Sequence, residues 1–353
     1  MEFLIANMIE KTPKTVSVYP EQIAIYQTDH LLSAYVCAFS PQRAVEKMQE
    51  PTEVLALDIG GDKLRRAQYR IEHGSLAKID EQVFPSGKGK GYLAILEKIA
   101  EEVTTQQMAV GISSATKMEG SVISRTTNLD EFFAEFLDKY GADYAVLFPE
   151  RSFVANDTIT GLCGSSTLLT SQGRAIPESV FVISASGLGA AVLKDHQATH
   201  VEIAHVPVIS ALNPLGQTRH CHIEAKNYVC VERVAAARAG IEDIYVQQTG
   251  EKKDGVAISA LYEHGDRLAT TLYETSALLV AHATEGLRQR YQFTDSGVVI
   301  FHGGNFQISK YRQEVLRDLS AFSVSPEQII FSRDLSQNVC LDGAAILATY
   351  FRR

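Results

Sequence analysis

The sequence predicts a two-lobed α/β fold, because a short apolar strand followed by a glycine turn occurs at three widely separated places. Apolar runs at 54–59, 180–183 and 298–301 each lead directly into such a turn. Short aliphatic runs are typical of buried strands, and ligands of α/β folds gather where such strands end. No short sequence repeat accompanies these three places. The coarse recurrence of strand and glycine turn suggests two similar lobes around a central cleft, each of which supplies a glycine turn. A length of 353 residues suits two such lobes.

The predicted domains begin with an extension of uncertain role at 1–50. A smaller α/β lobe follows at 51–155, with a C-terminal helix at 342–353 packing back onto it, and a larger α/β lobe covers 156–341. Within the extension, Ser40 followed by a proline is a helix-start signal. A short DNA-reading helix pair is one interpretation of this segment. Few basic residues and no helix–glycine-turn–helix spacing favour a packing or oligomerisation arm.

Composition excludes several classes of protein. The net charge is −9, whereas a general nucleic-acid binder needs a basic face. No apolar run approaches the roughly 20 residues of a membrane helix, and the first ten residues make a poor secretory signal. An odd number of cysteines in a long chain indicates reduced thiols, so we expect a cytoplasmic protein. From the charge and the lack of long apolar runs, we expect neither nucleic-acid nor membrane partners. The cysteines are Cys37, Cys163, Cys221, Cys230 and Cys340.

The smaller lobe is predicted to begin with an antiparallel meander. Its three strands are joined by short turns, and a flexible glycine–lysine loop at 86–91 follows them. An amphipathic helix further on is expected to be capped near Asn128 and Asp130. The predicted elements are strands at 54–59, 65–71, 78–84 and 109–113 and helices at 92–105 and 130–140.

The larger lobe shows a second set of elements. The strand at 180–183 ends in a Ser/Gly turn, from which the chain returns as a strand. Long helical stretches then precede the last strand. The predicted elements are strands at 180–183, 190–193 and 298–301, helices at 228–239 and 266–290, and a final helix that begins at Gly343.

The end of the first strand carries the earliest functional signal. Asp58 closes this strand and is followed by Gly60 and Gly61, which allow the backbone to approach a ligand closely. A carboxylate here is suitably placed for a magnesium-bound phosphate. An ordinary strand–turn with a capping aspartate is the alternative.

A second signal lies at Asn156 and Asp157, where an apolar strand delivers an amide and a carboxylate side by side. Such a carboxylate is a natural general base for a hydroxyl group, and the amide can orient that hydroxyl. The alternative is that Asp157 caps the helix that Thr158 opens.

A third group consists of Glu202, His205 and Glu232. Glu202 and His205 are three residues apart, and Glu232 begins a predicted helix. Carboxylates accept several hydrogen bonds, which suits a polyol with its many hydroxyl donors.

In this order and spacing, the motifs resemble the bacterial glucokinases and the wider ROK sugar-kinase group, which share a superfamily with hexokinase, actin and the 70-kDa heat-shock chaperones. The likeness covers roughly residues 54–350. It comprises Asp58-Ile-Gly-Gly61, Thr127-Asn128-Leu129, Asn156-Asp157, Ser186-Gly-Leu-Gly189, Glu202 with His205, Glu232-Arg-Val with Gly240-Ile-Glu-Asp-Ile-Tyr245, Gly303-Gly304 and Gly343-Ala-Ala.

The resemblance implies a ribonuclease-H-like fold and an ATP- and Mg²⁺-dependent hexose kinase. Asp157 would remove a proton from a sugar hydroxyl, most readily the 6-hydroxyl of glucose, and that oxygen would attack the γ-phosphorus of ATP. Mannose, fructose and N-acyl amino sugars stay open as substrates, and a homodimer is implied. The implied sugar-binding residues are Asn128, Asn156, Asp157, Glu202, His205 and Glu232. The implied ATP- and phosphate-binding residues are Asp58 (which also holds Mg²⁺ through water), Gly60, Gly61, Asp62, Lys63, Ser186, Gly187, Gly189, Gly303 and Gly304.

The chain departs from the family pattern in four places. Asp62 replaces the usual threonine of the first phosphate turn, and a carboxylate repels phosphate oxygens unless a cation such as Lys63 or Arg65 compensates. Residues 184–185 are Ser-Ala where glycine is common, and Ala204 replaces a glycine between Glu202 and His205. The segment 114–118 lacks the usual Gly-Pro, which points to a shifted sugar specificity.

Zinc is a separate question, because many ROK proteins hold it with the motif histidine and a cysteine-rich loop. Here the ligand types suit zinc, but the spacing and glycines of the family loop are missing. The alternative is a zinc-free loop, as in the glucokinase branch, and the Glu232 segment favours that branch. The candidate ligands are His205 and Cys230 with two of His220, Cys221 and His222.

Two other functions compete with the kinase. A non-catalytic sugar sensor or regulator of the same fold has no need of a base at Asp157, although Asp62 is consistent with it. A carboxylate or acyl-phosphate kinase would need basic groups at the acceptor, where Glu202 and Glu232 would repel an acid.

Overall fold

The computed structural model describes residues 36–353, apart from 87, 120, 127–128, 149–151, 209–212, 214–215, 218, 222–227 and 353. The described chain forms two compact units. Unit 1 contains residues 180–192 and 201–331, and unit 2 contains residues 36–179, 193–200 and 332–352. The predicted lobe boundaries at 51–155 and 156–341 stay a prediction.

Unit 2 is built on a five-stranded sheet with the strand order β4-β3-β2-β5-β8. The first three strands pair antiparallel, which confirms the predicted meander, whereas β5 and β8 continue the sheet in parallel. The strands are β2 (Thr52–Ile59), β3 (Lys63–Glu72), β4 (Ser75–Pro85), β5 (Ala109–Ser114) and β8 (Ser152–Asn156).

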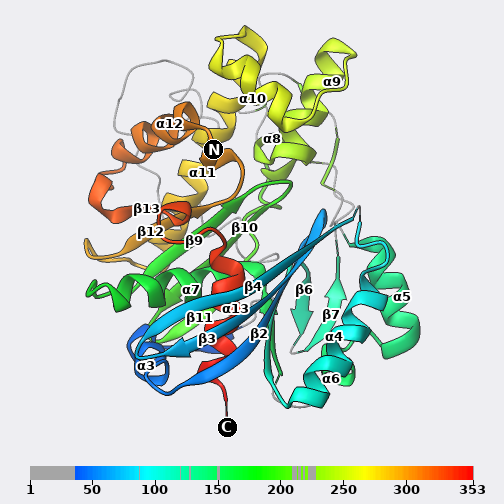
Figure 1. Cartoon of the computed structure of the whole chain (residues 1–353). Coiled ribbons are helices and arrows are strands. Elements are labelled where there is room, and N and C mark those ends of the chain that lie inside the picture. Colours follow the sequence, from blue (N-terminus) through cyan, green and yellow to red (C-terminus); the bar gives the residue numbers. More distant parts are fainter. Residues whose placement is uncertain are drawn as a thin grey trace. The chain divides into compact units, whose positions relative to one another are not determined.

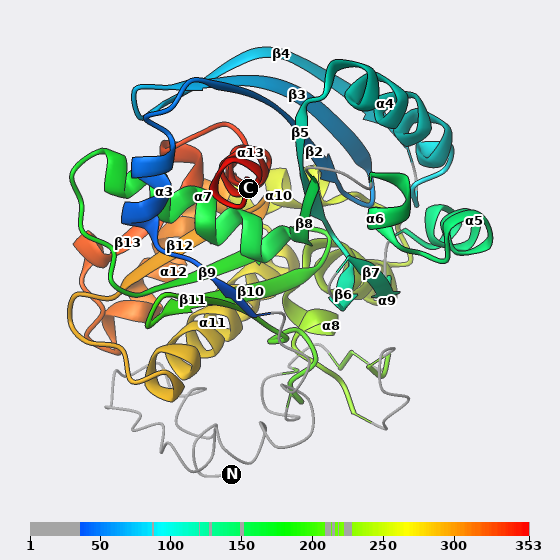
Figure 2. The ribbon, with the colours of Figure 1, turned by 90° about the horizontal axis from the view of Figure 1, so that it is seen from below.

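The two faces of this sheet are covered by different helices, as Figure 2 shows. Leu55, Leu57 and Ile59 of β2 share a buried cluster with α4 (Tyr92–Gln106) and α5 (Asp130–Tyr140). Because side chains alternate along a strand, Ala56 and Asp58 face the opposite side. On that side lie α7 (Asp157–Ser171) and α13 (Val339–Tyr350), which contacts β2, β5 and α7. The alternation therefore directs Asp58 toward α13.

Glycines allow α13 to lie against its neighbours backbone to backbone (Figure 1). A Cβ atom on Gly343 would lie 1.8 Å from the carbonyl oxygen of Thr160 in α7, and one on Gly111 of β5 would lie 1.9 Å from that of Ala344. Real Cβ atoms do not approach this closely, so larger residues here would force the helices apart. The start of α13 is thus held firmly against both the sheet and α7.

Residues 36–50 add one strand and one helix to unit 2. Strand β1 (Val36–Ala38) pairs antiparallel with β11 (Gln197–Val201), and α3 (Pro41–Lys47) follows. Ser40 is the N-cap of α3 and accepts a hydrogen bond from the backbone N–H of Arg43, which confirms the predicted helix start. Residues 1–35 of the predicted extension lie outside the described residues. The remaining elements of unit 2 are β6 (Lys117–Glu119), β7 (Val122–Arg125) and α6 (Tyr144–Leu147).

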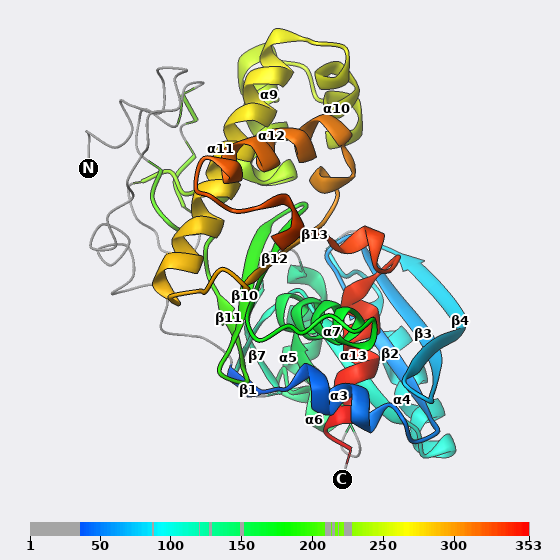
Figure 3. The ribbon, with the colours of Figure 1, turned by 90° about the vertical axis from the view of Figure 1, so that its left-hand side faces the viewer.

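Unit 1 places helices around strands that pair in the order β10-β9-β12-β13, and the long helix α11 is prominent in Figure 3. Its buried core joins these strands to the helices through Val182, Phe301, Val280 and Tyr311. The strands are β9 (Ser179–Ser184), β10 (Leu188–Lys194), β12 (Val298–His302) and β13 (Ile329–Phe331). The helices are α8 (Glu232–Ala235), the π-helix η2 (Ala237–Glu242), α9 (Asp243–Thr249), α10 (Gly255–Glu263), α11 (Arg267–Arg290), η3 (Asn305–Gln307), α12 (Ser309–Ser320) and η4 (Pro326–Gln328), with η5 (Ser332–Asp334) following in unit 2.

Two predicted helix starts are wrong. The helix predicted at 228–239 begins only at Glu232, because residues 229–231 pair with residues 206–208 instead. The final helix begins at Val339 rather than Gly343, and Asn338 caps it. Helix α5 begins at Asp130 and ends at Tyr140, as predicted. Its N-cap is Leu129, which makes no side-chain capping bond, and Asn128 lies outside the described residues.

Two further features concern the helices and the cysteines of the described chain. Within the described part of the chain, no helix is both long and apolar enough to cross a membrane. The five cysteines are all free and buried.

Candidate functional site

The first predicted phosphate turn lies in unit 2, between β2 and β3. The backbone N–H of Gly60 donates to the carbonyl oxygen of Lys63 at 3.1 Å, which closes the turn. Asp62 and Lys63 are exposed. Arg65 donates to Oδ2 of Asp58 at 2.9 Å, so its guanidinium group neutralises Asp58. Of the two cations considered as compensation for Asp62, Arg65 is therefore committed to another carboxylate.

Asn156, not Asp157, is the N-cap of α7. Its Oδ1 accepts from the backbone N–H of Thr158 at 2.9 Å, and its Nδ2 donates to the carbonyl oxygen of Thr116 at 2.8 Å. The alternative that Asp157 serves as the cap is thereby excluded. Asp157 occupies the first position of the helix and is only partly buried. Both polar atoms of the Asn156 amide are therefore hydrogen-bonded, and the Asp157 carboxylate follows at the first helical position.

His200 is a buried neighbour of this segment that sequence reasoning missed. The Thr158 hydroxyl donates to Oδ1 of Asn156 at 2.6 Å, and its oxygen lies 2.8 Å from Nδ1 of His200. Since a hydroxyl has a single proton, the His200 Nδ1 must carry a hydrogen and donate to Thr158. The backbone on either side of Asp157 is thus held through side chains, and no local pattern near residue 200 signals this.

The second predicted phosphate turn, which includes Ser186 and Gly187, lies in unit 1 where β9 leads into β10. The backbone N–H of Ala185 donates to the carbonyl oxygen of Gly187 at 2.9 Å. Asn305 donates from Nδ2 to the Ser184 hydroxyl at 2.9 Å, which ties this turn to the residues after β12. Gly303 has a φ of +115°, and a Cβ there would lie 2.2 Å from the carbonyl oxygen of Ser184. Only glycine satisfies both constraints, so the turns at 184–187 and 303–304 form one assembly.

The predicted sugar-binding residues of unit 1 gather through backbone pairing. The N–H of Glu232 donates to the carbonyl oxygen of Ala204 at 2.8 Å, and that of Val231 donates to Val206 at 2.9 Å. As a result, Nε2 of His205 lies 3.7 Å from a Glu202 oxygen, and its Nδ1 lies 4.0 Å from a Glu232 oxygen. Two carboxylates thus lie on either side of one imidazole ring.

The pKa of the buried Glu232 carboxyl is raised to about 7. Burial is the main cause and the nearby Glu202 adds to the shift, while Arg233 and a hydrogen bond from the Leu188 backbone oppose it. Leu188 belongs to the second phosphate turn. The Glu232 side chain therefore joins that turn to the Glu202–His205 segment.

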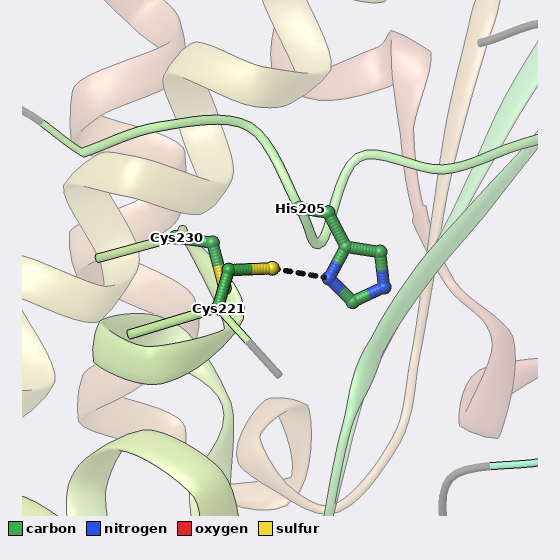
Figure 4. A group of neighbouring side chains, drawn as sticks. All are labelled: His205, Cys221 and Cys230. Carbon is green, nitrogen blue, oxygen red and sulfur yellow. Dashed lines mark hydrogen bonds between the residues drawn. The ribbon is translucent and has the colours of Figure 1, made fainter. Parts of the chain in front are cut away.

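The candidate zinc ligands are partly brought together. His205, Cys221 and Cys230 are all buried, and their ligand atoms lie within 4.8 Å of one another (Figure 4). The Cys221 Sγ lies 3.6 Å from Nδ1 of His205. Tetrahedral zinc with ordinary bond lengths places neighbouring N and S ligands about 3.5–3.8 Å apart, so the donor set fits this metal. His220 is exposed, and His222 lies outside the described residues.

Each unit thus carries its own group of predicted residues. None of the predicted roles follows from placement alone. Unit 2 holds Asp58, Gly60, Gly61, Asp62, Lys63, Asn156 and Asp157, and unit 1 holds Ser186, Gly187, Gly189, Glu202, His205, Glu232, Gly303 and Gly304.

The sequence profile of the ROK family matches residues 54–350. The chain belongs to the ROK family. The predicted resemblance is therefore confirmed over the range expected from the motifs.

Solved structures of ROK proteins share this fold. A ROK hexokinase from Thermus thermophilus aligns with a TM-score of 0.59 at 19% identity, over 84% of this chain and 97% of its own. A ROK glucokinase from Streptomyces griseus, in complex with glucose and AMPPNP, aligns with a TM-score of 0.55 at 20% identity, over 84% and 98%. A ROK transcriptional regulator, described as a homologue of the Escherichia coli MLC protein, aligns with a TM-score of 0.54 at 18% identity, over 98% and 95%.

These likenesses confirm the predicted fold class, the α/β fold of the actin and hexokinase type. At such identities they establish the fold alone. No curated protein sequence matches this ROK chain.

Proposed function

We propose that this ROK protein is an ATP-dependent hexose kinase that phosphorylates the 6-hydroxyl of glucose or a related sugar. The observation that carries the proposal is the Asn156–Asp157 pair at the start of α7. The amide makes the capping bonds, so the adjacent carboxylate is not needed to cap the helix. A carboxylate at this position can serve as general base for an attacking hydroxyl.

The mechanism assigns each residue a task. Asp157 accepts the proton of the 6-hydroxyl, and the resulting nucleophilic oxygen attacks the γ-phosphorus. Glu202, His205 and Glu232 hold the other sugar hydroxyls, a task for which acceptor-rich side chains are suited. The backbone N–H groups of the two phosphate turns bind phosphate oxygens. Catalysis of this kind depends mainly on positioning and charge.

Magnesium would be held at Asp58 through water. Mg²⁺ prefers oxygen ligands and keeps several waters, and Asp58 offers a partly buried carboxylate beside the first phosphate turn. When bound, the ion neutralises charge on the β- and γ-phosphates. The AMPPNP complex of the Streptomyces griseus glucokinase supports ATP as the donor.

A coupled ADP-release assay with Mg-ATP and a panel of hexoses tests this function. We expect release with one or two sugars, glucose first, then mannose, fructose or N-acyl amino sugars. Silence across the panel would contradict the kinase proposal.

The second candidate function is a sugar-responsive regulator without catalysis. Alignment with the ROK transcriptional regulator covers 98% of this chain, whereas alignments with the two kinases cover 84%, so the likeness to the regulator extends over more of the sequence. Calorimetric binding of a sugar together with no ADP release would favour this candidate.

We also propose that the protein is a homodimer. Light scattering on the purified protein measures its mass directly.

We expect Asp62→Thr to raise the kinase rate or tighten ATP binding by about fivefold. Removal of one like charge near phosphate oxygens is worth roughly 1 kcal/mol at a surface site. Arg65, one of the two cations considered as compensation, is paired with Asp58. Steady-state kinetics with varied ATP measure the effect, and Asp62→Asn, which removes the charge at constant size, is the matched control. An unchanged or slower rate in both variants would show that Asp62 has a positive role.

We further propose that His205, Cys221 and Cys230 hold zinc, which would tie the segments around residues 205, 221 and 230 together. We expect about one zinc per purified chain by elemental analysis, and less than about a tenth of that in Cys230→Ser, because losing one of few ligands removes most of the affinity. Cys163→Ser, at a buried cysteine outside the trio, is the control and should retain the metal. A wild-type protein that stays zinc-free after dialysis against the metal would contradict this proposal.

A further inference from the structure

Among the residues that the structure describes, one oxygen of Asp58 receives two hydrogen bonds and the other receives none. Within the described residues, Arg65 Nη1 and Asn338 Nδ2 both donate to Oδ2 at 2.9 Å. The side chain of Asp58 is 13% exposed, so it is neither sealed in the core nor fully solvated. Two donors on a single oxygen fix the plane of the carboxylate and leave Oδ1 as the acceptor that is not engaged.

Asn338 is separated from Asp58 by 280 residues and comes from the start of α13. Its Oδ1 accepts from the backbone N–H of Leu341 at 3.2 Å, which caps the helix. A backbone N–H can only donate and a carboxylate can only accept, so the orientation of the amide is fixed by its two partners. Serine or aspartate would cap a helix equally well. What the amide adds is the donor directed at Asp58.

The donor is held in place by the tight packing of α13. A Cβ on Gly164 of α7 would lie 2.5 Å from the carbonyl oxygen of Val339, the residue next to Asn338. One turn further, Asp342 accepts from the Tyr69 hydroxyl of β3 at 2.6 Å. The Ser336 hydroxyl also donates to Asp342 and accepts from the Asn338 backbone N–H at 3.2 Å. The turn before α13 is therefore fixed to the sheet that carries Asp58.

The same helix turn reaches the proposed base. The Cys340 thiol donates to the carbonyl oxygen of Asp157 at 3.4 Å. Asn338 and Cys340 thus connect α13 to both Asp58 and Asp157. Within unit 2, the position of one carboxylate relative to the other depends on how α13 begins.

We propose that Asn338 is a positioning residue for phosphoryl transfer, which holds Asp58 so that its Oδ1 accepts from water bound to magnesium. The inference rests on the proposed kinase function and adds a residue that none of the sequence motifs includes. Arg65 supplies the same oxygen with a second donor from a longer and more exposed side chain. Partners that orient metal-holding groups commonly affect metal affinity by 10- to 100-fold.

The test compares the binding of AMPPNP by calorimetry with excess Mg²⁺ and with EDTA, which needs no turnover. Asn338→Ser retains a helix cap and loses the donor to Asp58, so it should fold like the wild type. Tyr69→Phe is the matched control, because it loosens the same end of α13 without removing a bond to Asp58. We expect magnesium to lower the Kd for AMPPNP in the wild type. In Asn338→Ser, the ratio of the Kd with EDTA to the Kd with Mg²⁺ should be about tenfold smaller than in the wild type. Tyr69→Phe should lower the melting temperature and keep the wild-type gain.

The outcomes separate the two claims. A wild-type gain from magnesium that Asn338→Ser retains in full would overturn the positioning role and leave the kinase proposal intact. A wild type that binds no AMPPNP under either condition would overturn both proposals.

The kinetics of Asn338→Ser give a second readout. The positioning role predicts a lower kcat and a higher magnesium requirement with an unchanged KM for the sugar. A purely structural defect would not change the magnesium requirement alone.

Discussion

Asp157→Ala is expected to lower the rate of phosphoryl transfer by about 10²- to 10⁴-fold, the usual contribution of a general base. Sugar binding should persist, because Glu202, His205 and Glu232 supply the other acceptors proposed for the sugar. The fold should persist too. Asn156 provides the cap of α7, so the helix does not need the Asp157 carboxylate as its cap. The favourable interaction of that carboxylate with the helix dipole is worth about 1 kcal/mol or less.

Two further variants make this result specific. Asp157→Asn has the same size without the basic carboxylate, and it should lose as much activity as the alanine variant. Asn156→Ala removes the cap and the bond to Thr116, and it should lower the free energy of unfolding by about 1–2 kcal/mol. Coupled ADP release and calorimetric sugar binding measure the two effects. Near-normal rates in Asp157→Asn would show that another group is the base.

Substitution by alanine should affect the stability of the protein differently at Gly303 and at Gly304. Gly303→Ala places a Cβ 2.2 Å from the Ser184 carbonyl oxygen in a backbone conformation that alanine avoids. We expect it to destabilise the protein by roughly 2–4 kcal/mol, from strain and overpacking together. Gly304 has φ −63° and ψ −39°, and a Cβ there would meet nothing within 4 Å. Gly304→Ala should leave stability unchanged or raise it by about 0.5 kcal/mol.

If the adenosine of ATP lies against the backbone at residue 304, a methyl group there will clash with the nucleotide only. We therefore expect Gly304→Ala to bind ATP at least about tenfold more weakly while its melting curve matches the wild type. Differential scanning calorimetry and nucleotide titration give the two quantities. Wild-type ATP affinity in this variant would contradict the proposed role of Gly304 in ATP binding.

The local parts of the fold were predictable from sequence. The meander of β2, β3 and β4 follows from apolar runs and short turns, and the start of α3 follows from Ser40 and Pro41. Helix α11 lies within a residue of its predicted bounds. In each case, neighbouring residues contain the information.

The errors arise where distant residues decide the outcome. Residues 229–231 look helical, but their backbone pairs with residues 206–208, and a π-helix follows α8. Gly343 suggests a helix start, whereas it allows α13 to pass Thr160 closely. The same holds for the site. Asn338 and His200 act through partners 280 and 42 residues away, so no local motif marks them.

Phosphorus NMR of a reaction that contains the wild-type protein, glucose and Mg-ATP tests the central claim most directly. The account predicts a new phosphomonoester signal that couples to the two C6 protons of the hexose, together with the signals of ADP, and neither in Asp157→Asn. Unchanged ATP signals with glucose and the other hexoses, while the protein binds a sugar by calorimetry, would contradict the kinase and favour the regulator.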